Sequence, residues 1–177
     1  LYSLLQFIGA PLFGALSDRV GRRPVLLVSL TGILISYVIW FFAGSFELLV
    51  IARLLGGIMS ANISTATAIV ADVTDLKDRS RGMAIIGIAF GLGFIFGPAL
   101  GGLLGSVDPR LPFWAAAALS LANAMYGLFV LPESLPPERR RAFEWRRANP
   151  LGSLRLLRSH PELSGLAGVV FLSNLAH

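Results

Sequence analysis

The sequence predicts an all-α, polytopic membrane protein. Of its 177 residues, 55% are apolar and only 14% are charged, which is too hydrophobic for an ordinary soluble domain. Charge-free runs at 25–46, 82–107 and 111–132 each exceed the roughly 20 residues that cross a bilayer as a helix. These runs lack the polar stripe that a soluble helical core shows. They are also too long for barrel strands, so helices must satisfy the backbone in lipid.

In chain order, we expect five helices and the beginning of a sixth. The first run, 1–17, is apolar but has no basic leader, so it is not a signal peptide. The third, 54–71, reaches spanning length only if Arg53 is tolerated within it. Both chain ends lie within apolar runs, so we expect a fragment of a longer protein. The expected domains are a transmembrane bundle at 1–132, a basic linker at 133–161 and the start of a second bundle at 162–177.

The basic charge is distributed unevenly between the two sides of the membrane that alternating helices define. Thirteen of the fifteen Lys and Arg residues lie in the connections at 18–24, 73–81 and 133–161 or at their edges. By the positive-inside rule, these three connections are predicted to be cytoplasmic, and the connections at 44–47 and 105–112 are predicted to lie on the opposite side. The net charge of +5 therefore indicates membrane topology, and nucleic acid is not an expected partner.

The densest polar stretch is the turn at 18–24. Gly21 supplies the backbone freedom of a tight turn, and Pro24 suits the first position of the next helix. Asp18 lies at the C-terminal end of the first helix, where the helix dipole disfavours a carboxylate. We therefore expect a cationic or helix-N-terminal partner for Asp18. Ordinary surface charges are the alternative, but the dense pattern favours a partner across a moving interface.

This turn resembles a signature of the major facilitator superfamily, Gly14-x-x-x-Asp18-Arg19-x-Gly21-Arg22-Arg23. The likeness is closest to the tetracycline-resistance type of drug/proton antiporter. Ala71-Asp72-x-Thr74-Asp75, Leu131-Pro132-Glu133-Ser134 and Asn149-Pro150-Leu151 are similar to the same pumps. The resemblance implies a partial bundle: helices 2–6, the central loop and the start of helix 7, with helix 1 missing. It also implies a conformational latch made of Gly14, Asp18, Arg19, Gly21, Arg22, Arg23 and Asp72.

Two carboxylates, Asp72 and Asp75, end the third span on the side of that turn. A carboxylate at a helix C-terminus needs a cation, which Arg22 or Arg81 could supply. The competing interpretation is a local pair between Asp75 and Arg79, four residues apart.

Arg53 is the charge within a predicted span. An intramembrane guanidinium costs about 2.5–3.5 kcal/mol on insertion scales and normally faces protein or a wet cavity. On a helical wheel Gly57, Ser60, Ser64 and Thr67 lie on the same face. Snorkelling to the nearer surface is the alternative. The pattern Arg53-x-x-x-Gly57 resembles the superfamily's helix 4 signature, which implies a role in proton coupling and places these five residues at a cavity.

Small residues dominate the fourth span. Glycines spaced by four would form a groove that lets another helix approach, and Pro98 would bend the helix. Ordinary packing is the alternative for such a pattern. The Gly-Pro pair followed by Gly-Gly resembles the helix 5 signature of the antiporters and so favours export. The residues concerned are Gly93, Gly97, Pro98, Gly101 and Gly102.

The sequence shows no catalytic or nucleotide-binding set, no cysteine and no histidine pair at metal-ligand spacing, so we expect neither an enzyme nor a cofactor. The resemblance implies proton-driven efflux of a small amphipathic drug across the bacterial cytoplasmic (inner) membrane. A tetracycline–divalent metal chelate is the first candidate, with Gln6 as a substrate contact and the C-terminal bundle as partner. An exporter of another drug or metabolite, or a non-transporting receptor or assembly factor, is the alternative.

Overall fold

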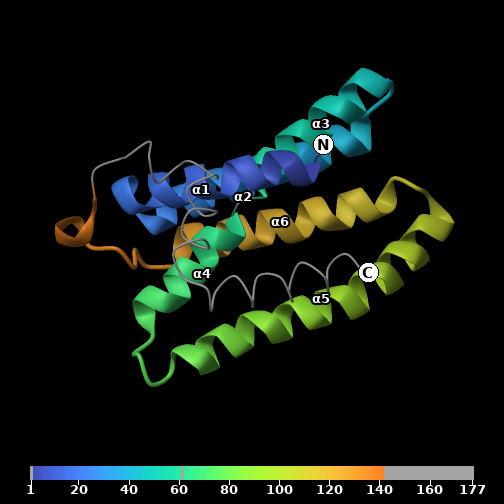
Figure 1. Cartoon of the computed structure of the whole chain (residues 1–177). Helices are drawn as coiled ribbons and strands as arrows, with labels where there is room; N and C mark the ends of the chain where they lie inside the picture. The colour runs from blue at the N-terminus through green and yellow to red at the C-terminus, as the bar shows by residue number, and fades with distance from the viewer. Residues whose placement is uncertain (1, 61, 142–177) are drawn as a thin grey trace, which may run out of the picture.

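The structure, a computed structural model, describes residues 2–60 and 62–141. This part of the chain forms helices and no strand (Figure 1). The elements are α1 (Tyr2–Val20), α2 (Arg22–Phe42), α3 (Phe46–Met59), α4 (Asn62–Val73), α5 (Arg79–Val107), α6 (Leu111–Phe129) and the short 3-10 turn η1 (Pro137–Arg139). Among the described residues, four stretches are long and apolar enough to cross a membrane: α2, Phe46–Val73, α5 and α6. The predicted all-α polytopic class is thus confirmed.

The turn predicted at 44–47 is found at 43–45, within the charge-free run 25–46. Helix α2 ends at Phe42, and Ser45 caps the start of α3 by accepting a hydrogen bond from the Leu48 amide at 3.4 Å. Arg53 consequently lies roughly two helical turns into α3 and not at the edge of its helix. Pro24 is the third residue of α2 instead of the first, still within the turn whose amides need no helical partner.

The third span also differs from the single helix predicted at 54–71. It begins earlier, at Phe46, and is assigned as two helices, α3 ending at Met59 and α4 beginning at Asn62. The Ser60 amide donates a hydrogen bond to the Gly56 carbonyl at 2.9 Å at the end of α3.

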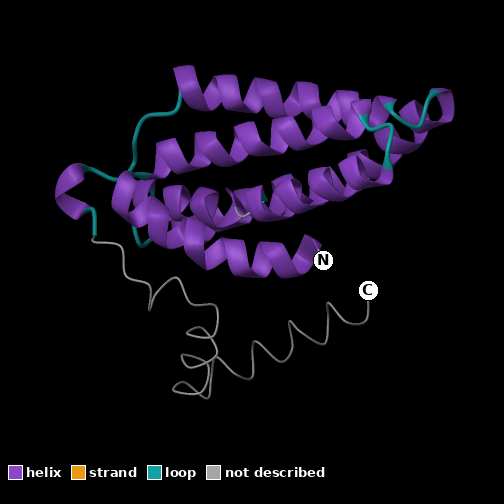
Figure 2. Cartoon of the chain, turned by 90° about the horizontal axis from the view of Figure 1, so that it is seen from above, coloured by secondary structure: helices purple, strands orange, loops and turns teal. Residues whose placement is uncertain are grey.

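Helices α2 and α6 pack antiparallel along most of their length. Arg23 at the start of α2 reaches the end of α6, and Trp40 near the end of α2 stacks on Phe113 with ring centroids 4.8 Å apart. Gly127 of α6 makes room for Leu27, since an added Cβ would lie 3.1 Å from that side chain. Helix α1, which begins at the end marked N in Figure 2, contacts α2, α3 and α4.

Small hydroxyl residues fill the contacts among α1 to α4. The fully or nearly fully buried polar side chains are Ser17, Ser29, Ser36, Ser60 and Thr65. Residues of this size let membrane helices approach closely. The four serine hydroxyls donate hydrogen bonds to backbone carbonyls, whereas the Thr65 hydroxyl has no partner in the described structure. The contact surface is therefore built from small residues more than from large apolar ones.

Helix α5 lies apart from the other helices over most of its length. Among the described elements it contacts α4 and α6, near its own ends, where Gly82 faces Val70 and Gly105 faces Pro112. Its large apolar side chains are exposed.

The connections at 18–24 and 73–81 and the segment 130–141 gather at one end of the bundle (Figure 1). This grouping agrees with the predicted alternation; the cytoplasmic assignment stays a prediction. Residues 142–161 of the predicted linker, and 162–177, lie outside the described residues.

Candidate functional site

The hinge between α1 and α2 is a single residue, Gly21. Gly21 has a φ of 120°, and within the described part of the chain it is the residue with a positive φ. This backbone angle lets the chain reverse direction between α1 and α2 through a single residue. A Cβ at this position would collide with Oε2 of Glu133. Gly21 is therefore required both by its backbone angle and by the approach of a distant carboxylate.

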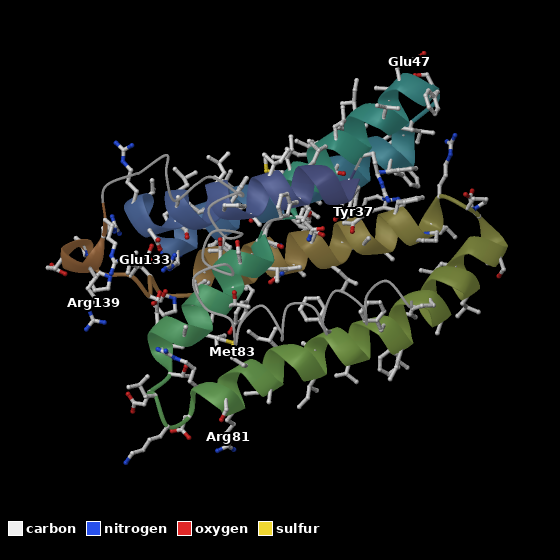
Figure 3. The ribbon with its side chains drawn as sticks, viewed as in Figure 1. Tyr37, Glu47, Arg81, Met83, Glu133 and Arg139 are labelled. Atoms are coloured by element: carbon white, nitrogen blue, oxygen red, sulfur yellow. The ribbon has the colours of Figure 1, made fainter. Side chains whose placement is uncertain are left out.

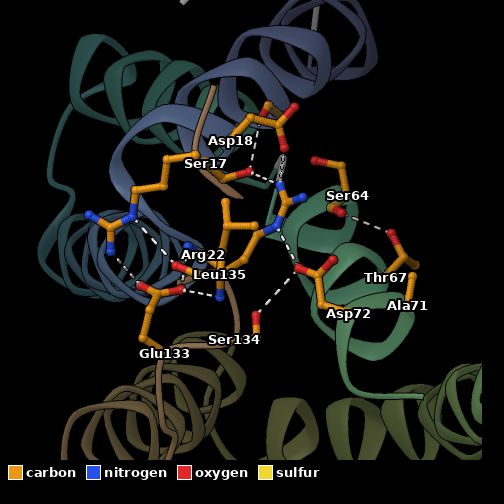
Figure 4. A network of polar contacts seen from close by, with 12 residues as sticks. Ser17, Asp18, Arg22, Ser64, Thr67, Ala71, Asp72, Glu133, Ser134 and Leu135 are labelled. Atoms are coloured by element: carbon orange, nitrogen blue, oxygen red, sulfur yellow. Dashed lines mark hydrogen bonds and ion pairs between the residues drawn. The ribbon is translucent and has the colours of Figure 1, made fainter. Parts of the chain in front are cut away.

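Arg22 is the centre of a polar cluster that joins three helices (Figure 4). Its Nη1 lies 2.5 Å from Oδ1 of Asp18 on α1, and its Nε lies 3.0 Å from Oδ2 of Asp72 on α4. Nη1 also donates to Ser17 Oγ at 2.7 Å. The Arg22 side chain is only 12% exposed, so these contacts are partly shielded from solvent. The predicted cationic partner of Asp18 is thus Arg22.

Arg22 is also the cation that pairs with Asp72. The sequence left Arg22 and Arg81 open, and the structure pairs Asp72 with Arg22. The alternative local pair between Asp75 and Arg79 is absent from the described contacts, because the Arg79 guanidinium donates to the Ala71 carbonyl at 3.2 Å instead. Arg79 thereby caps the end of α4.

Glu133 completes the cluster and was not among the predicted site residues. Its Oε1 accepts from the backbone amides of Arg22 at 2.9 Å and Leu135 at 3.0 Å. Because Gly21 has no side chain to cap α2, Glu133 supplies the missing acceptor at the positive end of that helix. Ser134 Oγ lies 3.5 Å from Asp72 Oδ2. The carboxylate directly after α6, in Leu-Pro-Glu-Ser, was the available signal.

Charges on the following turn border the same cluster. Arg140 lies 4.0 Å from Glu133, and the Arg141 amide donates to the Asp18 carbonyl at 2.9 Å. Together with the Arg22 contacts they enclose a polar cavity of about 630 Å³. The residues that line this cavity are Asp18, Arg22, Asp72, Leu135, Glu138, Arg139, Arg140 and Arg141. The segment after α6 is therefore tied to α1, α2 and α4.

The remaining predicted latch residues have other positions. Arg23 donates from Nε to the Gly127 carbonyl at 3.1 Å and also contacts the Leu128 carbonyl, so it caps the end of α6. Arg19 is exposed and makes no hydrogen bond or ion pair within the described residues. Gly14 contributes its carbonyl to Ser17 Oγ at 2.8 Å and has open space beside it. The structure thus groups Asp18, Arg22 and Asp72 around Gly21 and places the others outside.

Arg53 borders a second, smaller cavity of about 110 Å³ between α1, α2 and α3. Its guanidinium carbon lies 4.7 Å from the centre of the Tyr2 ring. The cavity is lined by Tyr2, Ile33, Ser36, Tyr37, Trp40, Ala52, Arg53 and Gly56. The lining residues from α2 were not among the predicted site residues. The available signal was the helical spacing of Ile33, Tyr37 and Trp40, which places them on one face.

The predicted polar stripe below Arg53 does not line this cavity. Gly57 and Ser60 are buried, with Gly57 against Tyr2 and Leu5, and Ser60 Oγ bonds the Gly57 carbonyl at 2.9 Å. Thr67 lies on α4, near the end of the bundle that carries Gly21 (Figure 4). Its hydroxyl donates to the carbonyls of Ile63 and Ser64. The separation along the chain is the physical reason for Thr67, since the 14 residues from Arg53 to Thr67 span about 21 Å of helix. Gln6 is half-buried on α1 and also lies outside the lining.

The glycine face of α5 is open in the described structure. An added Cβ at Gly93, Gly97, Gly101 or Gly102 would meet no atom of another described element within 4 Å. An apolar groove of about 760 Å³ runs along the α4–α5 side, lined in part by Ala66, Gly93 and Pro98. The helix is continuous through Pro98. Close approach of another helix to this face stays a prediction.

Comparisons with known proteins agree on one relationship. The family model described as Major Facilitator Superfamily matches residues 1–176. The chain is 42% identical over 175 residues to the tetracycline resistance protein, class C, of Escherichia coli, covering 99% of this chain and 44% of that protein. It is 48% identical over 140 residues to major facilitator superfamily domain-containing protein 10 of Bos taurus, covering 79% of this chain and 30% of that protein.

A solved structure shows the same likeness in three dimensions. The crystal structure of the human organic anion transporter MFSD10 (TETRAN) superposes with a TM-score of 0.79 and 44% identity, covering 89% of this chain and 37% of the other. The chain therefore spans less than half the length of these relatives.

Proposed function

The chain belongs to the major facilitator superfamily, and from this we propose that it forms part of a proton-coupled exporter of small amphipathic organic molecules. Tetracycline, as its chelate with a divalent metal, is the first substrate to test, because tetracycline resistance proteins are among the similar sequences. In this proposal the membrane is the cytoplasmic (inner) membrane, the proton gradient is the energy source, and any metal enters as part of the substrate, with no resident cofactor.

The observation that supports transport best is the cluster centred on Arg22. It connects α1, α2, α4 and the segment after α6 at one end of the bundle through Asp18, Asp72 and Glu133. In rocking-bundle transport, two bundles alternately expose a site near the midplane. Charged contacts confined to one end can favour one of the two states, since a state is stabilised only by interactions that the other lacks.

We assign this cluster the role of a latch that holds the outward-facing state. The partner bundle would come from the C-terminal part of the same protein. The carboxylate that takes up the proton is placed outside this chain, because the acids in the described helices lie near helix ends. Protonation of this carboxylate would shift the population between the two conformational states, because its affinity for the proton differs between them.

Transport of organic anions is the second candidate. The similarity to the human organic anion transporter MFSD10 supports it, and so does a specific feature of this chain. Arg53 stands at a cavity with aromatic walls, a combination that suits an anionic aromatic molecule better than a cationic one. Drug efflux and anion transport differ in the substrate and share the fold.

The test is uptake of tetracycline into inverted membrane vesicles that contain the whole protein. Uptake should require an imposed proton gradient and stop when a protonophore dissipates it. Asp18→Asn should lower the rate at least several-fold, while Glu47→Gln, an exposed acid at the other end of the bundle, serves as the matched control. If uptake of tetracycline and of a panel of organic anions is absent with and without the gradient, the transporter assignment fails in favour of a receptor or assembly role.

A further inference from the structure

Arg53 is a cation in an apolar helix without an anion beside it. No hydrogen bond or ion pair of its guanidinium is found within the described residues, and the contact it does make is with the Tyr2 ring at 4.7 Å. A charged side chain in a membrane span is normally paired or faces a wet cavity. The second condition is met here, because Arg53 borders the cavity between α1, α2 and α3.

The N–H donors of the Arg53 guanidinium are used by no hydrogen bond or ion pair within the described residues. The contact with the Tyr2 ring does not consume them, so they are available to a ligand. Ser36, which also lines the cavity, donates its hydroxyl to the Ala52 carbonyl at 2.8 Å. Arg53 is therefore the charged donor of this cavity, and the rings of Tyr37 and Trp40 supply apolar and edge contacts.

The size of the cavity limits what it can hold. Pockets for drug-sized ligands measure about 300–1,000 Å³, and this one measures about 110 Å³. It has room for a planar anionic head and the edge of one ring, while the rest of a larger molecule would extend outside. It lies away from the end that carries Glu133 and Arg139, as the position of Tyr37 shows (Figure 3).

We propose that this cavity is an anion subsite, in which Arg53 binds the carboxylate or enolate head of an aromatic amphipathic substrate and the surrounding rings contact its first ring. The planar fork of an arginine matches a carboxylate with two parallel hydrogen bonds. This inference rests on the proposed transport function and names the substrate charge that the site selects. It differs from a role in proton coupling, since the anion comes from the ligand.

The test compares two probes of nearly equal shape, 4-nitrobenzoate and 4-nitrobenzamide, at neutral pH. Their binding to the whole protein in lipid nanodiscs is measured by isothermal titration calorimetry, without any proton gradient. We expect the carboxylate to bind at least tenfold more tightly, which corresponds to about 1.4 kcal/mol. Arg53→Gln should bring the ratio to within twofold of one, and Arg53→Lys should retain part of the preference. Trp40→Leu should weaken both probes and leave the ratio unchanged.

Arg110→Gln is the matched control, because Arg110 lies near the same end of the bundle and outside the cavity. A ratio near one in the unmodified protein would overturn the proposal, and so would a preference that survives Arg53→Gln. The first result is expected if an acid from elsewhere in the protein neutralises Arg53, or if the side chain snorkels. Binding and transport are separate readouts: selective binding without tetracycline uptake refutes the proposed function alone, and uptake without selectivity refutes the subsite alone.

Discussion

Glu133→Ala should destabilise the protein by releasing the start of α2 from the segment after α6. In the structure, one carboxylate oxygen accepts from the amides of Arg22 at 2.9 Å and Leu135 at 3.0 Å. The Arg22 amide is one of the unpaired donors at a helix N-terminus, and α2 has no side-chain cap of its own. The substitution therefore leaves two partly buried donors without an acceptor.

The magnitude of this destabilisation follows from two energy terms, both reduced by partial exposure. A hydrogen bond to a charged group contributes about 1.5–3 kcal/mol, and a carboxylate at a helix N-terminus adds about 0.3–1 kcal/mol. The Glu133 side chain is 25% exposed, and the bond to Leu135 is local, so the lower values apply. We expect Glu133→Ala to lower the free energy of unfolding by about 2–3 kcal/mol. Glu133→Gln keeps a carbonyl acceptor and loses the charge, so it should cost only about 1 kcal/mol.

The assay is denaturant unfolding of the whole protein in detergent micelles, followed by circular dichroism. Glu138→Ala is the control, because Glu138 is an exposed carboxylate on the same segment with no hydrogen bond or ion pair among the described residues. Equal effects of Glu133→Ala and Glu138→Ala would refute the capping argument. If Glu133→Gln were as damaging as Glu133→Ala, charge rather than acceptor geometry would be the stabilising factor.

Three further substitutions test other parts of the structure. Gly21→Ala should cost about 2 kcal/mol or more in the same unfolding assay, because its φ is 120° and the new Cβ would meet the capping carboxylate. Gly14→Ala, in open helical surroundings, should instead be neutral or stabilise by up to about 1 kcal/mol; equal effects would contradict the hinge argument. Asp72→Asn should weaken the contact to Arg22 and make a cysteine placed beside it react faster with an impermeant thiol reagent; an unchanged rate would count against a latch. Thr65→Val should raise stability by about 1 kcal/mol, because the buried hydroxyl has no partner in the described structure, and a loss of stability would reveal a bond there.

The class of the fold and the location of the hinge could be predicted from residues close together in the chain. Apolar runs of spanning length require helices in lipid, whatever their neighbours are. Gly21 between two such runs indicated a tight turn, and its positive φ confirms it. The need of Asp18 for a cation followed from its place at a helix end, and Arg22, four residues later, meets it.

Helix ends were predicted less exactly, because they depend on local capping contacts. The turn predicted at 44–47 is found at 43–45, where α2 ends at Phe42 before the extended residue Ala43 and the cap of Ser45. The polar face predicted below Arg53 does not form one site, because Thr67 lies 14 residues from Arg53, about 21 Å along a helix.

By itself, the sequence determined that this is an all-helical membrane protein with its basic turns on alternate connections, because bilayer thickness and charge act on every segment independently. Only the tertiary structure decided that Glu133 caps α2 and that Tyr37 and Trp40 line a cavity together with Arg53. The Glu133 contact joins residues 111 positions apart. It exists because α6 returns antiparallel along α2, and no rule that acts within a few residues can specify which distant side chains such packing brings together.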